Sequence, residues 1–245
     1  MKIFVFSDCH GFANELIDAL DNAGFDKTNP NHLLVGCGDY FDRGKQPFEV
    51  MRFLKSVQNK VLVKGNHEQL LIDAINRGYP LSYDYSNGTF DTICELGHAG
   101  PWDTFDACCI KIDGMVKNWV SQMVNYYETE NYIFVHSWIP IISQNDGYYR
   151  YDDNWREAHS SQWDRAMWGN PFDMHFLNLN QTGKTIVFGH WHCSAGHKML
   201  GRCEDEFNYA IWEPCYADGI IGIDRCTAYT GKVNVLVLED ELCKD

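Results

Sequence analysis

The sequence predicts a single α/β domain organised around a parallel β-sheet, and three observations support this fold class. The N-terminal third alternates short apolar strands with amphipathic helices, which is the pattern of parallel strands joined by crossovers. Further apolar strands follow towards the C-terminus, with no internal repeat and no linker. The chain has 245 residues, enough for one sizeable core and ordinarily too few for two α/β domains. We therefore expect residues 1–245 to form one domain.

Three strand–helix pairs make up the first third of the chain. The expected strands are short and apolar, and they cover residues 3–6, 32–36 and 61–63. The expected helices carry apolar residues three and four positions apart, and they cover residues 13–23, 47–57 and 68–77. Gly24 and Gly78 end the first and third helices, while Pro47 opens the second. The order βαβαβα follows from these signals.

The rest of the chain is less regular. Residues 79–113 are rich in glycine, aspartate and aromatic residues without a clean period, so we expect an excursion from the sheet there. A broad apolar stripe predicts a helix over residues 115–127. Four more strands are expected, at residues 133–135, 185–188, 220–223 and 233–238. The last two are expected to form a hairpin whose turn is Thr230-Gly231-Lys232.

The composition excludes several classes of protein. A formal charge of −14 would repel a long nucleic acid, so we do not expect such a polyanion as the substrate. No apolar run is long enough to span a bilayer, and the ten cysteines form no CxxC pair, which is typical of reduced thiols. The apolar strand at residues 3–6 leads directly into polar motif residues. Together these features predict a cytoplasmic protein with no membrane partner.

Polar side chains of metal-binding types follow five of the predicted strands. These residues are Asp8 and His10, then Asp39, then Asn66 and His67, then His136, and finally His190 and His192. The carboxyl ends of parallel strands meet along one rim of a sheet, where residues distant in sequence come together. Residues two apart in an extended segment also point to the same side. A single histidine is more often a hydrogen-bonded structural residue, but this repetition predicts a metal centre.

The residues around these positions resemble the motifs of the calcineurin-like metallophosphoesterase superfamily. The matching segments are Asp8-Cys9-His10-Gly11, Gly38-Asp39-Tyr40-Phe41-Asp42-Arg43-Gly44, Gly65-Asn66-His67-Glu68, His136 and Gly189-His190-Trp191-His192. The second and third segments are similar to the phosphoprotein (serine/threonine) phosphatase branch, which includes lambda-phosphatase-like enzymes. The resemblance implies a four-layer αββα sandwich, in which two mixed β-sheets are flanked by helices.

The resemblance also implies two divalent metal ions with a ligand set for each. One ion would take Asp8, His10 and His192. The other would take Asn66, His136 and His190, and Asp39 would bridge both. A carboxylate suits a bridge because it has two oxygens and a charge that offsets two dications. This ligand set accepts several metals, and we expect manganese to support activity in an assay, with iron or zinc as alternatives.

Three further residues are expected to act on the substrate. In our hypothesis a metal-bound hydroxide attacks phosphorus, Arg43 holds phosphoryl oxygens through its planar guanidinium, and His67 protonates the leaving oxygen. Asp42 would orient His67 and raise its pKa. The alternative for Asp42 and Arg43 is a local ion pair that shapes a turn. Glu68 is interpreted as a charge favoured at a helix N-terminus.

Two positions depart from the phosphatase pattern. His192 adds a second histidine to the last motif, which points to the wider superfamily, where diesters as well as monoesters are substrates. The segment Met167-Trp168-Gly169 lacks the arginine that lambda-phosphatase-like enzymes place after the tryptophan to bind phosphate. Either Arg165 or Arg156 is a candidate to replace it. The expected substrate-binding residues are therefore Arg43, Asn66 and Arg165.

The motifs predict a phosphatase that acts on phosphoserine or phosphothreonine in proteins and also cleaves small phosphate esters. The enzymatic alternatives are a hydrolase of dinucleoside polyphosphates such as diadenosine tetraphosphate, and a phosphodiesterase. A non-catalytic metal-binding scaffold of the same fold is disfavoured because every ligand and catalytic position is filled. Aromatic residues crowd positions 138–168, where they either line a substrate cleft or cover the core.

Overall fold

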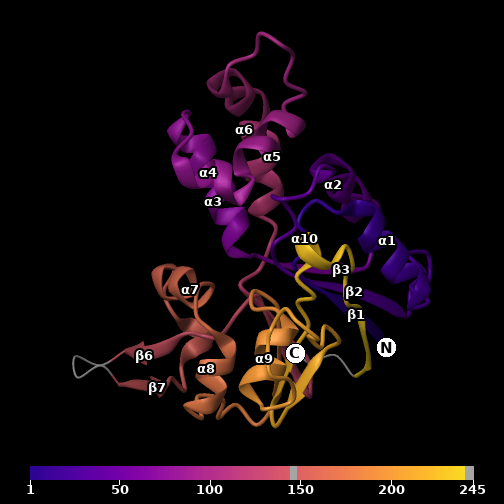
Figure 1. Cartoon of the computed structure of the whole chain (residues 1–245), viewed down its shortest axis with the longest axis vertical. Helices are drawn as coiled ribbons and strands as arrows, with labels where there is room; N and C mark the ends of the chain where they lie inside the picture. The colour runs from indigo at the N-terminus through magenta and orange to yellow at the C-terminus, as the bar shows by residue number, and fades with distance from the viewer. Residues whose placement is uncertain (144–147, 241–245) are drawn as a thin grey trace.

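The computed structural model describes residues 1–143 and 148–240 and places two β-sheets face to face (Figure 1). The first sheet has the order β11-β1-β2-β3, in which β1, β2 and β3 are parallel and β11 is antiparallel to β1. Its strands are β1 (Lys2–Phe6), β2 (His32–Cys37), β3 (Lys60–Val63) and β11 (Leu236–Glu239). Both βαβ crossovers of the first third are therefore confirmed.

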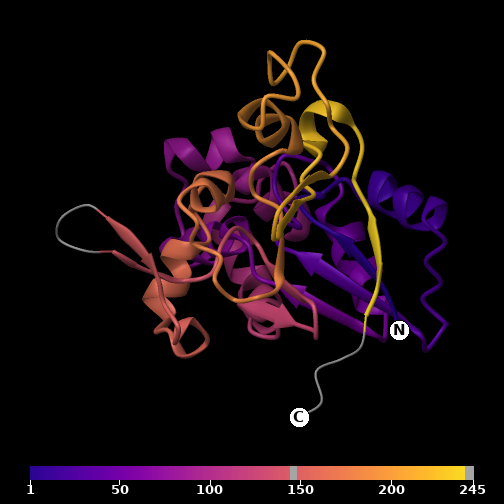
Figure 2. The ribbon, with the colours of Figure 1, turned by 90° about the horizontal axis from the view of Figure 1, so that it is seen from below.

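The second sheet has the order β4-β5-β8-β10-β9, with β5, β8 and β10 parallel and antiparallel strands at both edges. Its strands are β4 (Tyr126–Glu128), β5 (Tyr132–Val135), β8 (Thr185–Phe188), β9 (Cys215–Ala217) and β10 (Ile220–Gly222). A separate hairpin of β6 (Ile141–Ser143) and β7 (Tyr149–Tyr151) extends away from both sheets (Figure 2).

Side chains alternate between the two faces of each sheet, and this alternation builds the layers. From β1, Ile3 and Val5 enter the core between the sheets, while Phe4 and Phe6 enter the core beneath the first layer of helices. From β8, Val187 lies between the sheets, and its two neighbours pack under the second layer of helices. The four-layer sandwich with two mixed sheets is confirmed.

Helices cover the outer face of each sheet. The core on the outer side of the first sheet contains residues of α1 (Ala13–Asn22), α2 (Pro47–Ser56), α3 (Asn66–Arg77), α5 (Thr89–Leu96) and α6 (Phe105–Val120). The second sheet is covered by η1 (Trp155–Glu157), α7 (Ser160–Ala166), α8 (Pro171–Phe176) and α9 (Cys193–Met199). Trp155 and Trp163 are buried in this second layer. Of the two alternatives for the aromatic segment, these two residues therefore cover the core.

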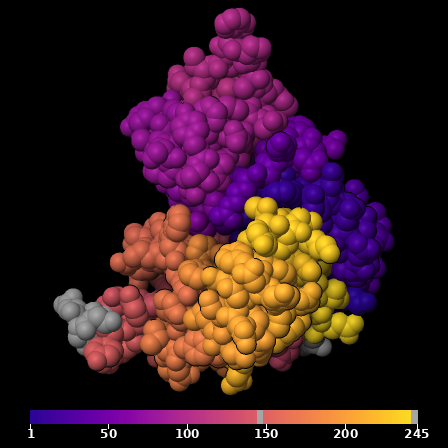
Figure 3. All heavy atoms as spheres, in the orientation of Figure 1, coloured from indigo at the N-terminus to yellow at the C-terminus, as the bar shows by residue number. Residues whose placement is uncertain are grey.

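The expected excursion after α3 is helical. It comprises α4 (Ser82–Asn87), α5 and α6, which form a lobe that projects from the rest of the molecule (Figures 1 and 3). The predicted helix at residues 115–127 was wrong at both ends, because α6 begins at Phe105 and ends at Val120. The hydroxyl of Thr104 caps its start by accepting the Ala107 N–H. Beyond the helix, Val124 forms a bridge with Val63, so its apolar side chain belongs to a strand-like segment.

The predicted hairpin around Thr230-Gly231-Lys232 was also wrong. The strands on its two sides lie in different sheets, because β10 belongs to the second and β11 to the first. Helix α10 (Thr227–Thr230) carries the chain across, and Gly231 ends it with a φ of 63°. The strand expected at residues 233–238 is β11 at residues 236–239, which pairs with β1 along an edge that would otherwise be unprotected.

Two simpler expectations concern the cysteines and the membrane. All nine cysteines in the described residues are free thiols, and Cys243 lies outside the described residues. Across residues 1–143 and 148–240, none of the helices combines the length and the apolar character that crossing a bilayer would require.

Candidate metal centre

The parallel strands of both sheets end at one rim, and the candidate ligands follow these ends. Asp8 follows β1, Asp39 follows β2 and Asn66 follows β3 in the first sheet, while His136 follows β5 and His190 follows β8 in the second. Asp8, Asp39, Asn66 and His136 are almost completely buried. The face-to-face packing of the sheets thus gathers polar side chains from two separate sets of strand ends.

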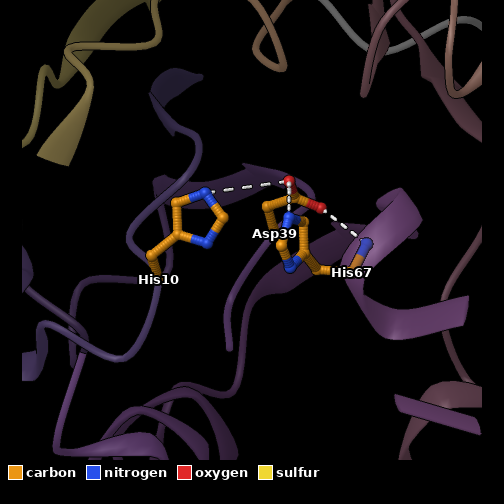
Figure 4. Close-up of side chains that lie close together, drawn as sticks. All are labelled: His10, Asp39 and His67. Carbon is orange, nitrogen blue, oxygen red and sulfur yellow. Dashed lines mark hydrogen bonds and ion pairs between the residues drawn. The ribbon is translucent and has the colours of Figure 1, made fainter. Parts of the chain in front are cut away.

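Asp39 lies at the middle of this gathering, and its two carboxylate oxygens face different partners. Oδ2 lies 3.8 Å from Nε2 of His10, and Oδ1 lies 3.4 Å from Nε2 of His136. Figure 4 shows His10 and His67 approaching the Asp39 carboxylate from different sides. Two groups of potential ligands, His10–Asp39–His67 and Asp39–His136–His190, therefore share this single aspartate.

The candidate ligands on each side of Asp39 lie close together. On one side, Nε2 of His136 lies 2.7 Å from Oδ1 of Asn66 and 3.1 Å from Nδ1 of His190. On the other side, Oδ1 of Asp8 lies 3.9 Å from Nε2 of His10. The backbone N–H of His190 donates to Oδ2 of Asp8, with a distance of 2.9 Å, and so links the ends of β1 and β8.

Backbone carbonyls orient three of the histidines. Nδ1 of His10 donates to the Phe41 carbonyl at 2.9 Å, and Nδ1 of His136 donates to the Cys37 carbonyl at 2.8 Å. The ring of His190 donates to the carbonyl of Trp168. In each ring one nitrogen carries a fixed proton, so the other nitrogen presents a lone pair to the centre. Histidines that bind metals are usually held in this way.

The loops that carry these residues have unusual backbone conformations. Six of the ten non-glycine residues with positive φ in the described residues lie here, namely Asp8, His10, Asp39, Asp42, Arg43 and His190. The left-handed region costs about 1–2 kcal/mol for such residues, and strain of this kind is typical of functional sites. Neighbouring glycines permit close approach, since a Cβ on Gly65 would lie only 2.2 Å from Oδ1 of Asp39.

Negative charge accumulates at the rim. Burial, followed by repulsion from Asp224 and Asp39, raises the pKa of Asp8 well above its usual range. Burial also raises the pKa of Asp224 to about 6. Burial opposes ionisation of Asp39 too, but the surrounding imidazoles hold its pKa below the usual range. Buried carboxylates this close together fit bound cations, which would relieve their mutual repulsion.

His67, Asp42 and Arg43 form a second cluster against the same aspartate. Nδ1 of His67 donates to Oδ2 of Asp42 at 2.7 Å. Arg43 points one guanidinium nitrogen at Nε2 of His10 (3.0 Å) and another at Nε2 of His67 (3.3 Å). Burial alone would lower the pKa of His67, but the carboxylates of Asp39 and Asp42 outweigh burial and raise that pKa. Asp42 therefore pairs with His67, as the hypothesis required, and the alternative Asp42–Arg43 ion pair is absent from the contacts of the described residues.

Sequence reasoning missed the residues that support this cluster. The hydroxyl of Thr89 donates to Oδ2 of Asp42 at 2.7 Å, and the backbone N–H of Asp42 donates to the hydroxyl of Thr92 at 3.0 Å. Both threonines are buried on α5. Gly88 packs against the backbone of Arg43, where a Cβ would lie 2.3 Å from the Arg43 nitrogen. These residues lie in the excursion, where no motif indicated such a role.

Glu68 does more than place a negative charge at the N-terminus of a helix. It is fully buried, and its carboxylate accepts the backbone N–H groups of Asp39, Tyr40 and Gly65, each at 2.9 Å. Glu68 thereby joins the loop after β2 to the loop after β3. Burial, with repulsion from Asp39, raises the pKa of Glu68 to about 7 even though these hydrogen bonds oppose the shift. Asp224 was missed as well, although it follows the parallel strand β10 and the strand-end rule would have found it.

His192 belongs to neither group of potential ligands around Asp39 in the described residues. His192 is the N-cap of α9, and its Nδ1 accepts the backbone N–H of Ala195 at 3.2 Å. Its ring packs against Phe207 and Trp212. When Nδ1 accepts a hydrogen bond, the neutral ring carries its proton on Nε2 and has no lone pair there for a metal. These contacts favour a capping role, and His192 as a ligand stays a prediction.

The two candidate arginines have different surroundings. Arg156 makes a two-pronged ion pair with Glu128, with distances of 2.6 and 2.8 Å, and it stacks over Trp155. Arg165 instead lines a pocket together with Trp168, the residue whose carbonyl holds His190. Within residues 1–143 and 148–240, Arg165 has no ion-pair partner. Of the two candidates, Arg165 is thus the one whose guanidinium is not held by a carboxylate in these parts of the chain, and its contact with substrate stays a prediction.

The residues at the rim fit a pair of divalent cations. They offer imidazole nitrogens and carboxylate and amide oxygens, the donors that first-row divalent metals accept. The two groups on either side of Asp39 supply separate ligand sets, with Asn66 beside the second. This donor set does not identify the metals.

Comparison with known proteins agrees with this geometry. The model of the calcineurin-like phosphoesterase family matches residues 1–194. Symmetrical bis(5'-nucleosyl)-tetraphosphatases are 37% identical over 73 residues in Buchnera aphidicola subsp. Baizongia pistaciae (strain Bp) and 36% identical over 69 residues in Coxiella burnetii (strain Dugway 5J108-111). These matches cover 29% and 28% of this chain, and they span only 26% and 23% of the relatives' own lengths.

Two solved structures share the fold over nearly the whole chain. A proposed diadenosine tetraphosphatase has a TM-score of 0.56 at 17% identity, covering 97% of this chain and 89% of that one. A cold-active protein tyrosine phosphatase has a TM-score of 0.56 at 16% identity, covering 97% of this chain and 73% of that one. The family match extends over more than half of the sequence and includes every motif at the rim. The chain therefore belongs to the calcineurin-like phosphoesterase family of metal-dependent phosphoester hydrolases.

Proposed function

We propose that this protein hydrolyses phosphate esters at a dinuclear metal centre bridged by Asp39. The observation that carries the proposal is that the two carboxylate oxygens of Asp39 face separate groups, His10 on one side and His136 with His190 on the other. Two bound divalent ions would supply an acidified water and positive charge around the phosphoryl group. The rim binds the ions through the side chains on both sides of Asp39.

His67 is proposed to protonate the leaving oxygen. Its Nδ1 donates to Asp42, which holds the ring in one orientation and leaves Nε2 facing the Asp39 side of the site. Burial lowers the pKa of His67, but the carboxylates of Asp39 and Asp42 raise it by more, which favours the protonated ring that this role requires. Positioned general acids typically accelerate a reaction by about 10²–10⁴-fold.

Arg43 is proposed to bind the phosphoryl group that is cleaved. Its guanidinium lies between His10 and His67, and thus between a proposed ligand and the proposed acid. A planar guanidinium binds two phosphoryl oxygens at once and orients the phosphorus. With so many buried carboxylates at the rim, this cation also attracts the anionic substrate.

Two classes of substrate are candidates. The motifs around Asp39 and Asn66 favour phosphoserine or phosphothreonine in proteins, as in the phosphatase branch that they resemble. The relatives named symmetrical bis(5'-nucleosyl)-tetraphosphatases favour dinucleoside polyphosphates, although the similarity covers less than a third of this chain. We expect manganese to support either activity.

The test is hydrolysis by metal-stripped protein before and after the addition of manganese. Glycerol 2-phosphate, a diester chromogen, a phosphoserine peptide and diadenosine tetraphosphate are offered in parallel. Release of phosphate or nucleotide only with manganese, and its loss in Asp39→Asn, would support the proposal. Turnover that survives both metal stripping and Asp39→Asn would rule it out. The substrate with the largest kcat/KM selects between the two classes.

A further inference from the structure

A pocket of about 480 Å³ lies beside the metal centre, and the proposed chemistry does not use it. Its walls come from the segment that follows His136, from the β6–β7 hairpin and from α7 to α8. Its volume falls within the range of about 300–1,000 Å³ that is typical of small-molecule sites. The pocket is therefore large enough for a bicyclic ring with a sugar.

The segment Trp168-Gly169 belongs both to the wall of the pocket and to the surroundings of the metal centre. The carbonyl of Trp168 accepts a hydrogen bond from His190, and the two rings are 6.3 Å apart. The carbonyl of Gly169 accepts the hydroxyl of Ser137, next to His136, at 2.6 Å. The same two residues line the pocket. A ligand in the pocket would therefore contact the same two residues that hold His190 and the segment around His136.

The walls suit a flat aromatic group. The side chains of Trp168 and Tyr149 are 52% and 47% exposed, although they belong to a lining that also contains Ile139 and Met174. Large aromatic faces left open to water beside an apolar wall gain free energy when a planar ring stacks on them. Every nucleobase offers such a ring, and stacking on an aromatic side chain tolerates any base.

Arg165 adds a positive charge to the same pocket. Within the parts of the chain that the structure describes, its guanidinium has no ion-pair partner, in contrast to Arg156, which is bound to Glu128. A guanidinium without a partner readily binds phosphate oxygens in a two-pronged geometry. The pocket thus combines faces for a ring with a cation for phosphate, in a chain whose formal charge is −14.

We propose that this pocket binds the nucleobase of a nucleotide substrate, with Arg165 contacting its phosphate chain while the phosphate to be cleaved lies at the metal centre. The inference rests on the proposed hydrolase function and selects the second candidate class, the dinucleoside polyphosphates. A phosphopeptide suits these walls less well, because most of the lining is apolar, like Ile139 and Met174, and cannot hydrogen-bond to backbone N–H and C=O groups. Trp168 and Arg165 are then specificity-determining residues.

Binding to the manganese-loaded protein tests the pocket without relying on turnover. Titration calorimetry compares ADP, ribose 5-phosphate and inorganic phosphate in wild type, Trp168→Leu, Arg165→Gln and the control Trp102→Leu. Trp102 is 94% exposed and lies outside the pocket lining. We expect the Kd of ADP to rise about tenfold in Trp168→Leu, since one stacked base contributes that much or more. The Kd of ribose 5-phosphate and of phosphate should change less than twofold.

Each other outcome has a definite meaning. Equal weakening of all three ligands in Trp168→Leu would show damage to the metal centre and overturn the proposal. An unchanged Kd for ADP in both pocket variants would overturn it as well, as would a phosphopeptide whose binding alone depends on Trp168. Manganese-dependent hydrolysis of glycerol 2-phosphate by the wild type, a substrate with no ring, reports separately on the proposed function. Its presence with unchanged ADP binding would refute the pocket alone.

Discussion

His136 and His67 are both buried histidines beside Asp39, yet they differ in their hydrogen-bond partners and in the direction of their pKa shifts. Nδ1 of His136 donates to a neutral carbonyl, that of Cys37, whereas Nδ1 of His67 donates to the carboxylate of Asp42. Burial lowers the pKa of His136, and Asp39 only partly offsets it. For His67 two carboxylates outweigh burial, and the pKa rises. Both rings are buried beside Asp39, so the additional carboxylate of Asp42 on the far side of His67 distinguishes the two directions of shift.

This difference assigns two kinds of chemistry to one residue type. A neutral imidazole has a lone pair for a metal, and a protonated one has a proton for a leaving group. The carbonyl side of Asp39 is therefore suited to binding ions, and the Asp42 side is suited to acid catalysis. Five substitutions test this division, from the largest expected effect to the smallest.

Asp39→Asn should have the largest effect, because it removes the charge and one ligand oxygen shared by both sides. We expect activity to fall by at least about a thousandfold, since metal assistance contributes several kcal/mol to the transition state. Metal analysis of the dialysed protein should show loss of one or both ions. Full metal content together with normal turnover would contradict the bridging position of Asp39.

His67→Gln should remove the acid while leaving the metals in place. We expect kcat to fall about a hundredfold with a phosphate ester of an ordinary alcohol. The loss should be much smaller with p-nitrophenyl phosphate, because its leaving group departs without protonation. Metal content near that of the wild type is the matching control. A loss of metal equal to that in Asp39→Asn would indicate that His67 is a metal ligand rather than the general acid.

Asp42→Asn should change the pH dependence as well as the rate. The protonated form of His67 is the active one, so kcat falls as pH rises through the pKa of His67. Removing the Asp42 carboxylate removes one of the charges that raise this pKa, so the alkaline limb should move to lower pH. We expect a loss of about thirtyfold at neutral pH, within the range for general acids. An unmoved alkaline limb would show that another group titrates there.

Thr89→Val should weaken acid catalysis by His67, because Thr89 holds the Asp42 carboxylate that orients the His67 ring. The variant keeps the shape of the side chain but removes the hydroxyl that donates to Oδ2 of Asp42. A hydrogen bond to a charged group is worth about 1.5–3 kcal/mol, so a loss of at least about tenfold is expected. The loss should again depend on the leaving group, and Thr89→Ser should restore activity. A loss that Thr89→Ser does not repair would indicate a packing defect in α5.

His192→Asn should have the smallest effect. Asparagine caps helices well, so α9 should keep its N-terminus, and only the imidazole is lost. If the capping contacts describe the role of His192, metal content stays normal and activity changes less than about twofold. Loss of one equivalent of metal would instead show that His192 is a metal ligand.

The first half of the fold could be predicted because each signal there is local. Residues 3–6 and 32–36 are apolar strands, and the helices that follow the second of them begin and end at recognisable residues, Pro47 for α2 and Gly78 for α3. The hairpin at residue 231 was wrong because the choice of sheet for residues 236–239 depends on the free edge of β1, more than two hundred residues earlier. Helix α6 was misplaced because its apolar stripe continues into Val124, which has strand-like pairing.

The site residues that directly follow strand ends could be predicted from the sequence. The residues that hold those side chains and loops in place could not. Asp39, His136 and His190 carry the chemistry on their own side chains, and parallel topology brings them together. Thr89 and Glu68 act through hydrogen bonds to residues in other loops, and their types are common on any helix. His192 matches a motif by position, but only the fold shows that its Nδ1 caps α9.

The pairing of β11 with β1 has a consequence for how the protein matures. The first sheet is complete only when residues 236–239 reach residues 2–5, and Asp8 meets His190 across a separation of 182 residues. Contacts between such distant residues form late in folding, because closing long loops is slow. During synthesis the ribosome must therefore release most of the chain before the rim is whole. Capture of both ions should then coincide with the last stage of folding, because the second group of ligands includes His136 and His190.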